Sequence, residues 1–208
     1  MNQKNSLGLN SCFLDLNDPI ELFNNWMEAA KKTEINDPNA FSLATANKKA
    51  IPSVRVVLLK DFDKDSFTFY TNLESQKSLE LKENPNAEMC FHWKSLLRQV
   101  RVKGLISKVQ DFKADKYYNS RPYDSKIGAW ASKQSSILKN REQLIKSIED
   151  YKIKYKDNKS IPRPNYWSGW FLIPKKIEFW LQVDGRIHER LVYEKNENDA
   201  WNKYLLSP

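Results

Sequence analysis

Beyond residue 40 the chain is dominated by short runs in which apolar and polar residues alternate, and most runs are separated by only a few residues. Side chains of a β-strand point alternately to the two faces of a sheet, so this period of two predicts half-buried strands. Connections of hairpin length join antiparallel neighbours, whereas parallel neighbours need a long crossover. The pattern therefore predicts an α+β fold in which an antiparallel sheet closes as a barrel, with helices packed outside it.

The predicted strands follow one another closely along the chain. They cover residues 40–46, 53–62, 66–71, 87–94, 97–109, 169–174, 176–183 and 186–195. Asp184 and Gly185 form a tight-turn dipeptide, which we expect to join the last two strands. The chain lacks the regular alternation of strand and helix that is typical of a doubly wound fold, so an antiparallel sheet is favoured.

Helical signals precede the sheet and interrupt it. Asp18 suits an N-cap, Pro19 suits the first helical position and Glu21 suits a capping box, so we expect a helix to begin there. Further helices are predicted at residues 75–85, 111–122 and 137–158, with a looser segment at residues 124–136. The segments beyond residue 110 form a helical insert between two groups of strands.

Length and composition favour one globular domain. A chain of 208 residues can bury a sizeable core, and a hydrophobic content of 40% with seven tryptophans argues against disorder. We expect one domain over residues 1–208, in which residues 1–17 can form a flexible N-terminal arm. No stretch resembles a secretory signal or approaches the roughly 18 apolar residues of a membrane span, which predicts a cytoplasmic protein without a membrane partner.

The charged residues and the cysteines limit the kinds of partner. The 34 basic against 26 acidic residues give a net charge of +8, which suits nucleic acid, a membrane surface or small anions. Because the lysines are spread along the whole chain, we interpret this charge as solvated surface and expect no nucleic-acid partner. Cys12 and Cys90 lie far apart without a C-x-x-C motif, so we expect reduced thiols and no metal site.

Any phosphate bound here must be held by side chains and helix N-termini. The sequence has neither a G-x-G-x-x-G nor a Walker motif, and it contains only five glycines. Arg55 lies among valines in a predicted strand, where it is either a rim residue that reaches water or an anion ligand. Arg121 and Ser125 stand at one predicted helix start, and Gln134 and Ser135 stand at another; each pair suits a phosphate site or an ordinary helix end.

Arg186, His188 and Arg190 occupy every second position of the last predicted strand, so we expect them to share one face and meet an anion. Trp180 lies across the predicted turn, where a core role is more common than stacking on a ligand. With two histidines, no G-x-S-x-G motif and no paired carboxylates, the chain offers no hydrolytic triad. If the protein is an enzyme, a cofactor carries the difficult chemistry.

Several motifs together resemble a known family. In chain order they are "PSVRVVLLKDFD", "FYTNLESQKSLEL", "LLRQVRV", "SRPYDSKIGAWASKQSS", "IEFWLQVDGRIHERLVY" and "DAWNKYLLSP". They resemble the pyridoxamine/pyridoxine 5′-phosphate oxidase family, which implies a homodimeric split β-barrel with FMN at the dimer interface. The resemblance also implies oxidation of either phosphorylated vitamer at C4′ to pyridoxal 5′-phosphate, in vitamin B6 biosynthesis or salvage. FMN would accept the hydride and O2 would reoxidise it, giving H2O2.

The resemblance assigns residues to each ligand. It implies that FMN is bound by Arg55, Val56, Val57, Leu58, Leu59, Lys60, Tyr70, Thr71, Gln76, Lys77, Gln99, Gln134, Ser135, Trp180 and Arg190. It implies that the substrate phosphate is held by Lys60, Tyr117, Arg121 and Ser125. Arg186 and His188 would lie over the pyridine ring as substrate-binding and catalytic residues, which orient C4′ rather than remove a proton.

Three positions depart from the family pattern. Gln76 stands where the family usually has an arginine for the FMN phosphate. Tyr123 stands at a position that we do not count as a ligand, and Leu205 replaces a C-terminal arginine whose role the sequence does not define. The first alternative is another FMN split-barrel protein, such as a flavin reductase-like or general stress protein. The others are a pyridoxal phosphate carrier without activity and a basic nucleic-acid-binding module.

The departure at Gln76 predicts weaker retention of FMN. A glutamine can donate a hydrogen bond to a phosphate but brings no positive charge. The Gln76→Arg variant is therefore expected to bind FMN roughly fivefold to tenfold more tightly than the wild type. Titration of FMN by fluorescence quenching measures both dissociation constants, and equal constants would contradict the prediction.

Overall fold

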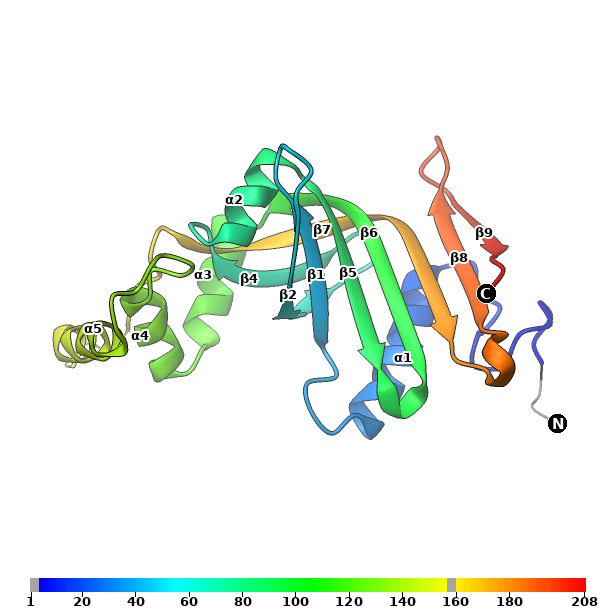
Figure 1. The fold of residues 1–208 in the computed structure, drawn as a ribbon, viewed down its shortest axis with the longest axis horizontal. Coiled ribbons are helices and arrows are strands. Elements are labelled where there is room, and N and C mark those ends of the chain that lie inside the picture. Colours follow the sequence, from blue (N-terminus) through cyan, green and yellow to red (C-terminus); the bar gives the residue numbers. More distant parts are fainter. Residues whose placement is uncertain (1–3, 157–159) are drawn as a thin grey trace.

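One curled antiparallel sheet organises the chain in the computed structural model, which describes residues 4–156 and 160–208 (Figure 1). Within these residues nine strands form the sheet: β1 (Ala40–Ala46), β2 (Pro52–Leu58), β3 (Asp61–Phe62), β4 (Phe67–Asn72), β5 (Asn86–Trp93), β6 (Arg98–Lys108), β7 (Trp167–Leu181), β8 (Glu189–Lys195) and β9 (Trp201–Leu205). Every pairing between them is antiparallel.

The order of the strands explains the curled shape. Hydrogen bonds connect them as β2-β1-β5-β6-β7-β4-β3, and β8 pairs with β7 and carries β9 at its other edge. No ladder among the described strands joins β2 to β3, so the barrel is split. The predicted α+β class with an antiparallel, barrel-like sheet is confirmed.

The described residues also form five α-helices. They are α1 (Pro19–Thr33), α2 (Gln76–Glu83), α3 (Asp111–Ser120), α4 (Tyr123–Ala131) and α5 (Arg141–Lys154). Of these, α4 and α5 lie together beyond one end of the sheet (Figure 1). Helix α1 begins as predicted, because the Asp18 carboxylate accepts a hydrogen bond of 2.8 Å from the Ile20 backbone N–H. Residues 157 and 158 of the predicted segment 137–158 lie outside the described residues. Among the described helices, none is long and apolar enough to cross a bilayer.

Helix α1 fills the inner face of the curl with aromatic side chains. Phe23 packs edge-on against Phe62, Phe67 and Phe91, with ring centroids 5.0–5.1 Å apart. Trp26 packs edge-on against Phe179 at 5.2 Å, and both Phe23 and Trp26 are almost fully buried. Edge-to-face geometry is favourable for aromatic pairs beyond the area they bury, so α1 fixes the curvature from inside.

The prediction of one strand over residues 53–62 is wrong, because the structure has two strands there. β2 ends at Leu58 and β3 begins at Asp61, because the chain changes partners between them. The Leu59 backbone N–H still donates to Asn39 beside β1, at 2.8 Å, whereas the Lys60 N–H donates to Thr68 of β4, at 2.9 Å. This change of partner carries the chain across the split of the barrel, and it leaves Lys60 outside a regular strand.

The segment 124–136, predicted to be loose, contains helix α4. Ile127 and Ala131 are buried on one face of α4, where Ile127 forms a small second core with Tyr155 and Ile161. Packing against this core overrides the weak helix propensity of Ser125 and of Gly128. Strand β9 is a further difference, since the sequence predicted no strand there; its five residues, WNKYL, are too few for a clear alternation of apolar and polar residues.

The two strands predicted at residues 169–174 and 176–183 are one strand, β7. Its pairing with β6 shifts by one residue between Lys103 and Gly104, and Pro174 stands opposite Gly104 at this bulge. A proline has no N–H to donate, so a strand tolerates it where a bulge already interrupts the ladder. The same shift brings the backbones close: a Cβ on Gly104 would lie 2.0 Å from the Ile173 carbonyl oxygen.

The N-terminal segment packs along β8. Leu9 and Phe13 are buried in the main core, and the Asn10 backbone N–H donates to the Glu189 carboxylate at 2.6 Å. The Tyr193 hydroxyl donates to the Leu16 carbonyl at 2.8 Å. These contacts tether the segment to the strand that follows the 184–186 turn, and the flexibility of the arm stays a prediction.

The close approach of the two backbones at Gly104 predicts that a single added methyl group has a large effect on stability. Because the clash falls on backbone atoms, Gly104→Ala is expected to lower the free energy of unfolding by about 2–4 kcal/mol. Gly128→Ala in helix α4 is the matched control, since no atom lies within 4 Å of the added methyl; it is expected to raise stability by about 0.5–1 kcal/mol. Urea unfolding measures both changes, and a Gly104→Ala protein as stable as the wild type would contradict this account of the bulge.

Candidate active site

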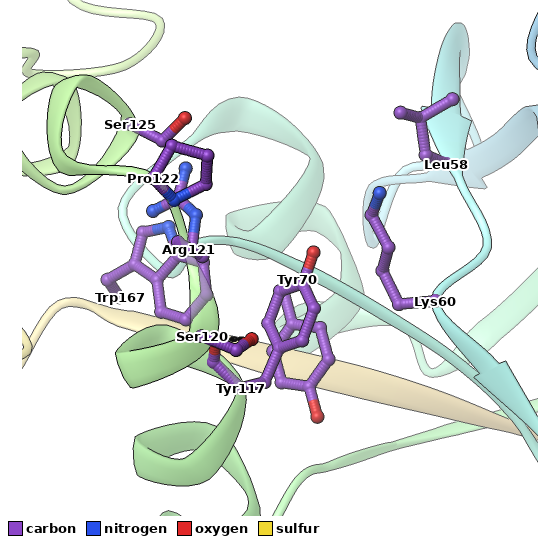
Figure 2. Close-up of a pocket in the computed structure, with 9 residues that line it drawn as sticks. All are labelled: Leu58, Lys60, Tyr70, Tyr117, Ser120, Arg121, Pro122, Ser125 and Trp167. Carbon is purple, nitrogen blue, oxygen red and sulfur yellow. Dashed lines mark hydrogen bonds between the residues drawn. The ribbon is translucent and has the colours of Figure 1, made fainter.

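A cavity of about 490 Å³ opens where strand β4 faces the junction of α3 and α4. It is lined by Leu58, Lys60, Tyr70, Tyr117, Ser120, Arg121, Pro122, Ser125 and Trp167. In Figure 2, Arg121 and Ser125 lie on one side of this cavity and Lys60 on the other, with the rings of Tyr70 and Tyr117 between them. All four residues predicted to hold the substrate phosphate therefore lie around one space.

Arg121 is the strongest cationic feature of this cavity. Its guanidinium lies over the Trp167 ring, 4.7 Å from the centroid, and its buried Nη1 has no hydrogen-bond partner in the structure. Burial lowers the pKa of Arg121, against a smaller opposite effect of Tyr117 and Tyr118. A buried donor without an acceptor is costly, so the geometry favours an anion at this position.

Three aromatic rings form the floor of the cavity. Tyr70 and Tyr117 are stacked with centroids 4.0 Å apart, and the Trp167 ring lies parallel to Tyr70 at 5.6 Å. Gly169 permits this stack, because a Cβ there would lie 2.7 Å from Cδ1 of Tyr70 and 2.9 Å from the Phe69 carbonyl oxygen. Burial, followed by the charge of Asp61, raises the pKa of Tyr70, which keeps its hydroxyl protonated as a donor.

A second cavity of about 380 Å³ adjoins the first and shares four lining residues with it. The shared residues are Tyr70, Arg121, Ser125 and Trp167. Thr71 and Gln134 line the second cavity, and the Thr71 hydroxyl lies 3.3 Å from Oε1 of Gln134. Trp167 contributes to both spaces but was not predicted, because an aromatic residue at a strand start is indistinguishable in sequence from a core residue.

Lys77, at the start of α2, is a buried cation. Its side chain is buried, and its Nζ contacts only hydroxyls among the described residues: Thr71 Oγ1 and Ser75 Oγ, both at 3.3 Å. Burial and the nearby charge of Arg55 lower the pKa of Lys77, against a smaller opposite effect of Glu80. An anion placed here would restore the missing charge balance, and the free N–H groups of the helix start would assist it.

A buried carboxylate holds the polar residues beside Lys77. Glu80 accepts hydrogen bonds from Arg55 at 3.2 Å, from Gln76 at 3.0 Å and from Ser53 at 2.8 Å, and it is also bonded by Thr45. Burial raises the pKa of Glu80, but these hydrogen bonds outweigh it and leave the pKa below its ordinary value. Glu80 thus fixes the half-buried Arg55 next to Lys77, and it also accepts a hydrogen bond from Gln76.

Three predicted flavin residues form one row across the sheet. Gln99 of β6 pairs with Trp180 of β7, which pairs with Arg190 of β8. Directly paired residues of neighbouring strands project to the same face, so these side chains lie side by side. The row lies at the opposite end of β7 from Trp167 and the two cavities (Figure 1).

The prediction that Arg186, His188 and Arg190 alternate along one strand is wrong. Residues 184–186 form a 3₁₀ turn in which Arg186 has φ 62°, and β8 begins only at Glu189. The tight turn is longer than two residues, so the alternation of a strand does not extend to Arg186. Its side chain is exposed and lies in the loop that joins β7 to β8.

His188 nevertheless lies beside the flavin row. Its ring is 4.7 Å from that of Trp180, and its Nδ1 accepts a hydrogen bond of 3.2 Å from the Val183 backbone N–H. When Nδ1 accepts, a neutral imidazole carries its proton on Nε2, which is then free to donate. The loop therefore presents a donor and an exposed arginine next to an aromatic surface.

The remaining predicted residues are dispersed. Val56 is exposed, Val57 packs against the core, Leu58 lines the first cavity and Leu59 is buried. Ser135 has φ 70° and lies in the loop after α4, so its prediction as a helix start is wrong.

The cap of the next helix, α5, is Asn140 instead. Its side chain accepts a hydrogen bond of 3.0 Å from the Gln143 N–H. The loop that carries Gln134 and Ser135 is therefore not a helix N-terminus, and any ligand bound there meets side chains and irregular backbone.

Comparison with known proteins identifies the family. The family model described as "Pyridoxamine 5'-phosphate oxidase" matches residues 27–155, more than half of the chain. The chain belongs to this family. A second model, described as "Pyridoxine 5'-phosphate oxidase C-terminal dimerisation region", matches residues 167–208, which include Trp180 and Arg190 of the flavin row and the loop with Arg186.

Individual relatives agree with the assignment. The chain is 64% identical over 208 residues, all of both chains, to a pyridoxine/pyridoxamine 5'-phosphate oxidase of Pelagibacter ubique. It is 49% identical to one of Allorhizobium ampelinum, covering 94% of this chain and 95% of the other. Among solved structures, PhzG from Burkholderia lata, in complex with tetrahydrophenazine-1-carboxylic acid, superposes with a TM-score of 0.88 at 29% identity, covering 95% and 96% of the two chains.

Proposed function

We propose that this protein is an FMN-dependent oxidase that converts pyridoxamine 5′-phosphate or pyridoxine 5′-phosphate to pyridoxal 5′-phosphate. The observation that carries the proposal is a pair of buried cations, Lys77 and Arg121, neither of which forms a salt bridge within the described residues. FMN and the substrate each bring one phosphate, of about −2 charge. The relatives in the family carry the same name for this activity.

The residues around Lys77 fit the phosphate of FMN. Lys77 and Arg55 supply positive charge, and Thr71 and Gln76 supply neutral donors at the start of α2. Gln99, Trp180 and Arg190 offer an aromatic and polar surface that suits a flavin ring. Bound by these residues, FMN would supply a hydride acceptor for the oxidation at C4′ of the vitamer, and its reoxidation by O2 would yield H2O2.

The first cavity fits the phosphorylated vitamer. Arg121 and Lys60 neutralise the phosphate, and Tyr117 and Ser125 donate hydrogen bonds to it. Arg186 and His188 hold the pyridine ring so that C4′ is aligned, and neither residue removes a proton from carbon. When the substrate is the amine, water hydrolyses the resulting imine and ammonia is released.

A complete site requires two copies of the chain. The first cavity, called the phosphate cavity from here on, and the flavin row lie at opposite ends of β7. They are about 13 residues, or roughly 40 Å, apart along the strand. Val54 and Val56 are 69% and 68% exposed on the edge strand β2, an apolar surface that a second copy can cover. We infer that the enzyme is a homodimer in which each site combines one end of each chain; its cytoplasmic location stays a prediction from the sequence.

Incubation of the purified protein with pyridoxamine 5′-phosphate tests the proposal. We expect pyridoxal 5′-phosphate and H2O2 in equal amounts, and a yellow cofactor that bleaches without oxygen. Pyridoxamine without the phosphate is the matched control and is expected to react at least a hundredfold more slowly, because Arg121 then has no anion. A colourless protein that is inert toward both compounds, and that binds RNA in a salt-sensitive way, would contradict the proposal.

Removal of Arg186 separates its role from that of the flavin residues. The Arg186→Ala variant is expected to lose at least a hundredfold in turnover while it retains bound FMN, because the side chain lies in an exposed loop rather than at the phosphate site. Stopped-flow measurement of flavin reduction gives the rate, and the absorption spectrum gives the FMN content. Loss of FMN from this variant would show a structural role for Arg186 and contradict the assignment.

A further inference from the structure

Glu178 is a buried carboxylate in the layer next to the flavin row. It lies on β7, two residues before Trp180, so both side chains project to the same face of the sheet. Only 6% of Glu178 is exposed, although a charged group is rarely buried without partners. Its partners are two arginines: Arg101 at 3.2 Å from one carboxylate oxygen and Arg190 at 2.7 Å from the other.

Arg190 is held from two sides. Its Nε donates to Oε1 of Glu178 at 2.8 Å, its Nη2 lies 2.7 Å from the same oxygen, and its Nη1 donates to the Ser207 carbonyl at 2.9 Å. A guanidinium has five N–H donors, so donors remain free beside these contacts. The guanidinium is therefore fixed in its plane while part of its donor edge remains available to a ligand.

The two arginines do not depend on Glu178 equally. Arg101 has a second carboxylate, Glu88, at 2.6 Å from its Nε. For Arg190, Glu178 is the one carboxylate partner within the described part of the chain. Loss of the charge on Glu178 would leave Arg101 paired with Glu88, whereas Arg190 would have no charged partner within the described part of the chain.

We infer that Glu178 is a positioning residue for Arg190, which it holds in the orientation that binds the flavin. The inference rests on the proposed function, because it takes Arg190 as a flavin ligand. An arginine side chain has several rotatable bonds, and fixing them before the ligand binds lowers the entropy that binding must overcome. Glu178 itself need not touch FMN, and its effect on FMN passes through Arg190.

A double-mutant cycle on FMN binding tests the inference. The variants are Glu178→Gln, Arg190→Ala and the double variant, and Glu88→Gln is the matched control because it removes a carboxylate of the same network that contacts Arg101 only. FMN dissociation constants are measured by fluorescence quenching of the apoprotein. Thermal unfolding and sedimentation establish that each variant is folded and has the association state of the wild type.

The expected result is specific to the pair. Glu178→Gln is expected to raise the FMN dissociation constant about fivefold, since a neutral amide replaces a charge-assisted bond, and Glu88→Gln is expected to change it less than twofold. In the Arg190→Ala background, Glu178→Gln is expected to add no further change. A Glu178→Asp variant keeps the charge and is expected to bind FMN more tightly than Glu178→Gln.

Other outcomes overturn the inference. Independent, additive effects of Glu178→Gln and Arg190→Ala would show that Glu178 does not act through Arg190. An equal rise of the FMN dissociation constant in Glu88→Gln would show a general effect of the ionic network. An unchanged dissociation constant in Glu178→Gln or in Arg190→Ala would show that the residue does not contribute to FMN binding. A wild-type protein that binds no FMN would overturn the proposed function as well, so the two failures are distinguishable.

Discussion

Buried positive charge without a salt bridge is the constraint on which the candidate site depends. Lys77 is buried among hydroxyls, and Arg121 has a buried donor with no acceptor. Burial lowers the pKa of both groups, as expected for a cation that has lost water without forming a salt bridge that compensates for it. A phosphate bound at these sites would recover the free energy that burial of the two cations costs, so the fold favours anionic ligands there.

The sheet determines where those ligands lie. β7 is long enough to carry the wall of the phosphate cavity at one end and the flavin row at the other, and the bulge at Gly104 allows it to curve without a break. Buried glutamates hold the arginines at each end: Glu80 holds Arg55 and Glu178 holds Arg190. In both cases a carboxylate orients the guanidinium while leaving part of it free.

Much of this fold could be predicted from the sequence, because hydrophobic alternation and helix caps are local signals. β1 matches residues 40–46, and α1 begins behind Asp18. The errors arose where tertiary contacts decide: the chain changes partners at Lys60, α4 packs into a second core around Ile127, and the turn at Arg186 is longer than its dipeptide suggests. None of these three features produces a periodic pattern of apolar and polar residues in the sequence.

The candidate site was predictable in part for the same reason. Lys60, Tyr117, Arg121 and Ser125 come together as the family resemblance implied. Trp167 was not predicted, because its role in the cavity depends on the stack that Gly169 permits. Glu178 was also not predicted as a site residue, since a glutamate in a strand is usually solvated and only its burial between two arginines sets it apart.

The central claim is that each active site joins the phosphate cavity of one chain to the Arg186 loop of the other. Mixed dimers of Arg121→Ala and Arg186→Ala chains test it most directly, since each variant alone is inactive at both sites. If the sites are shared, a mixed dimer has one intact site, and statistical mixing restores about a quarter of the wild-type activity. If both residues serve a site within one chain, every site in the mixture is damaged and no activity returns, which would contradict the account.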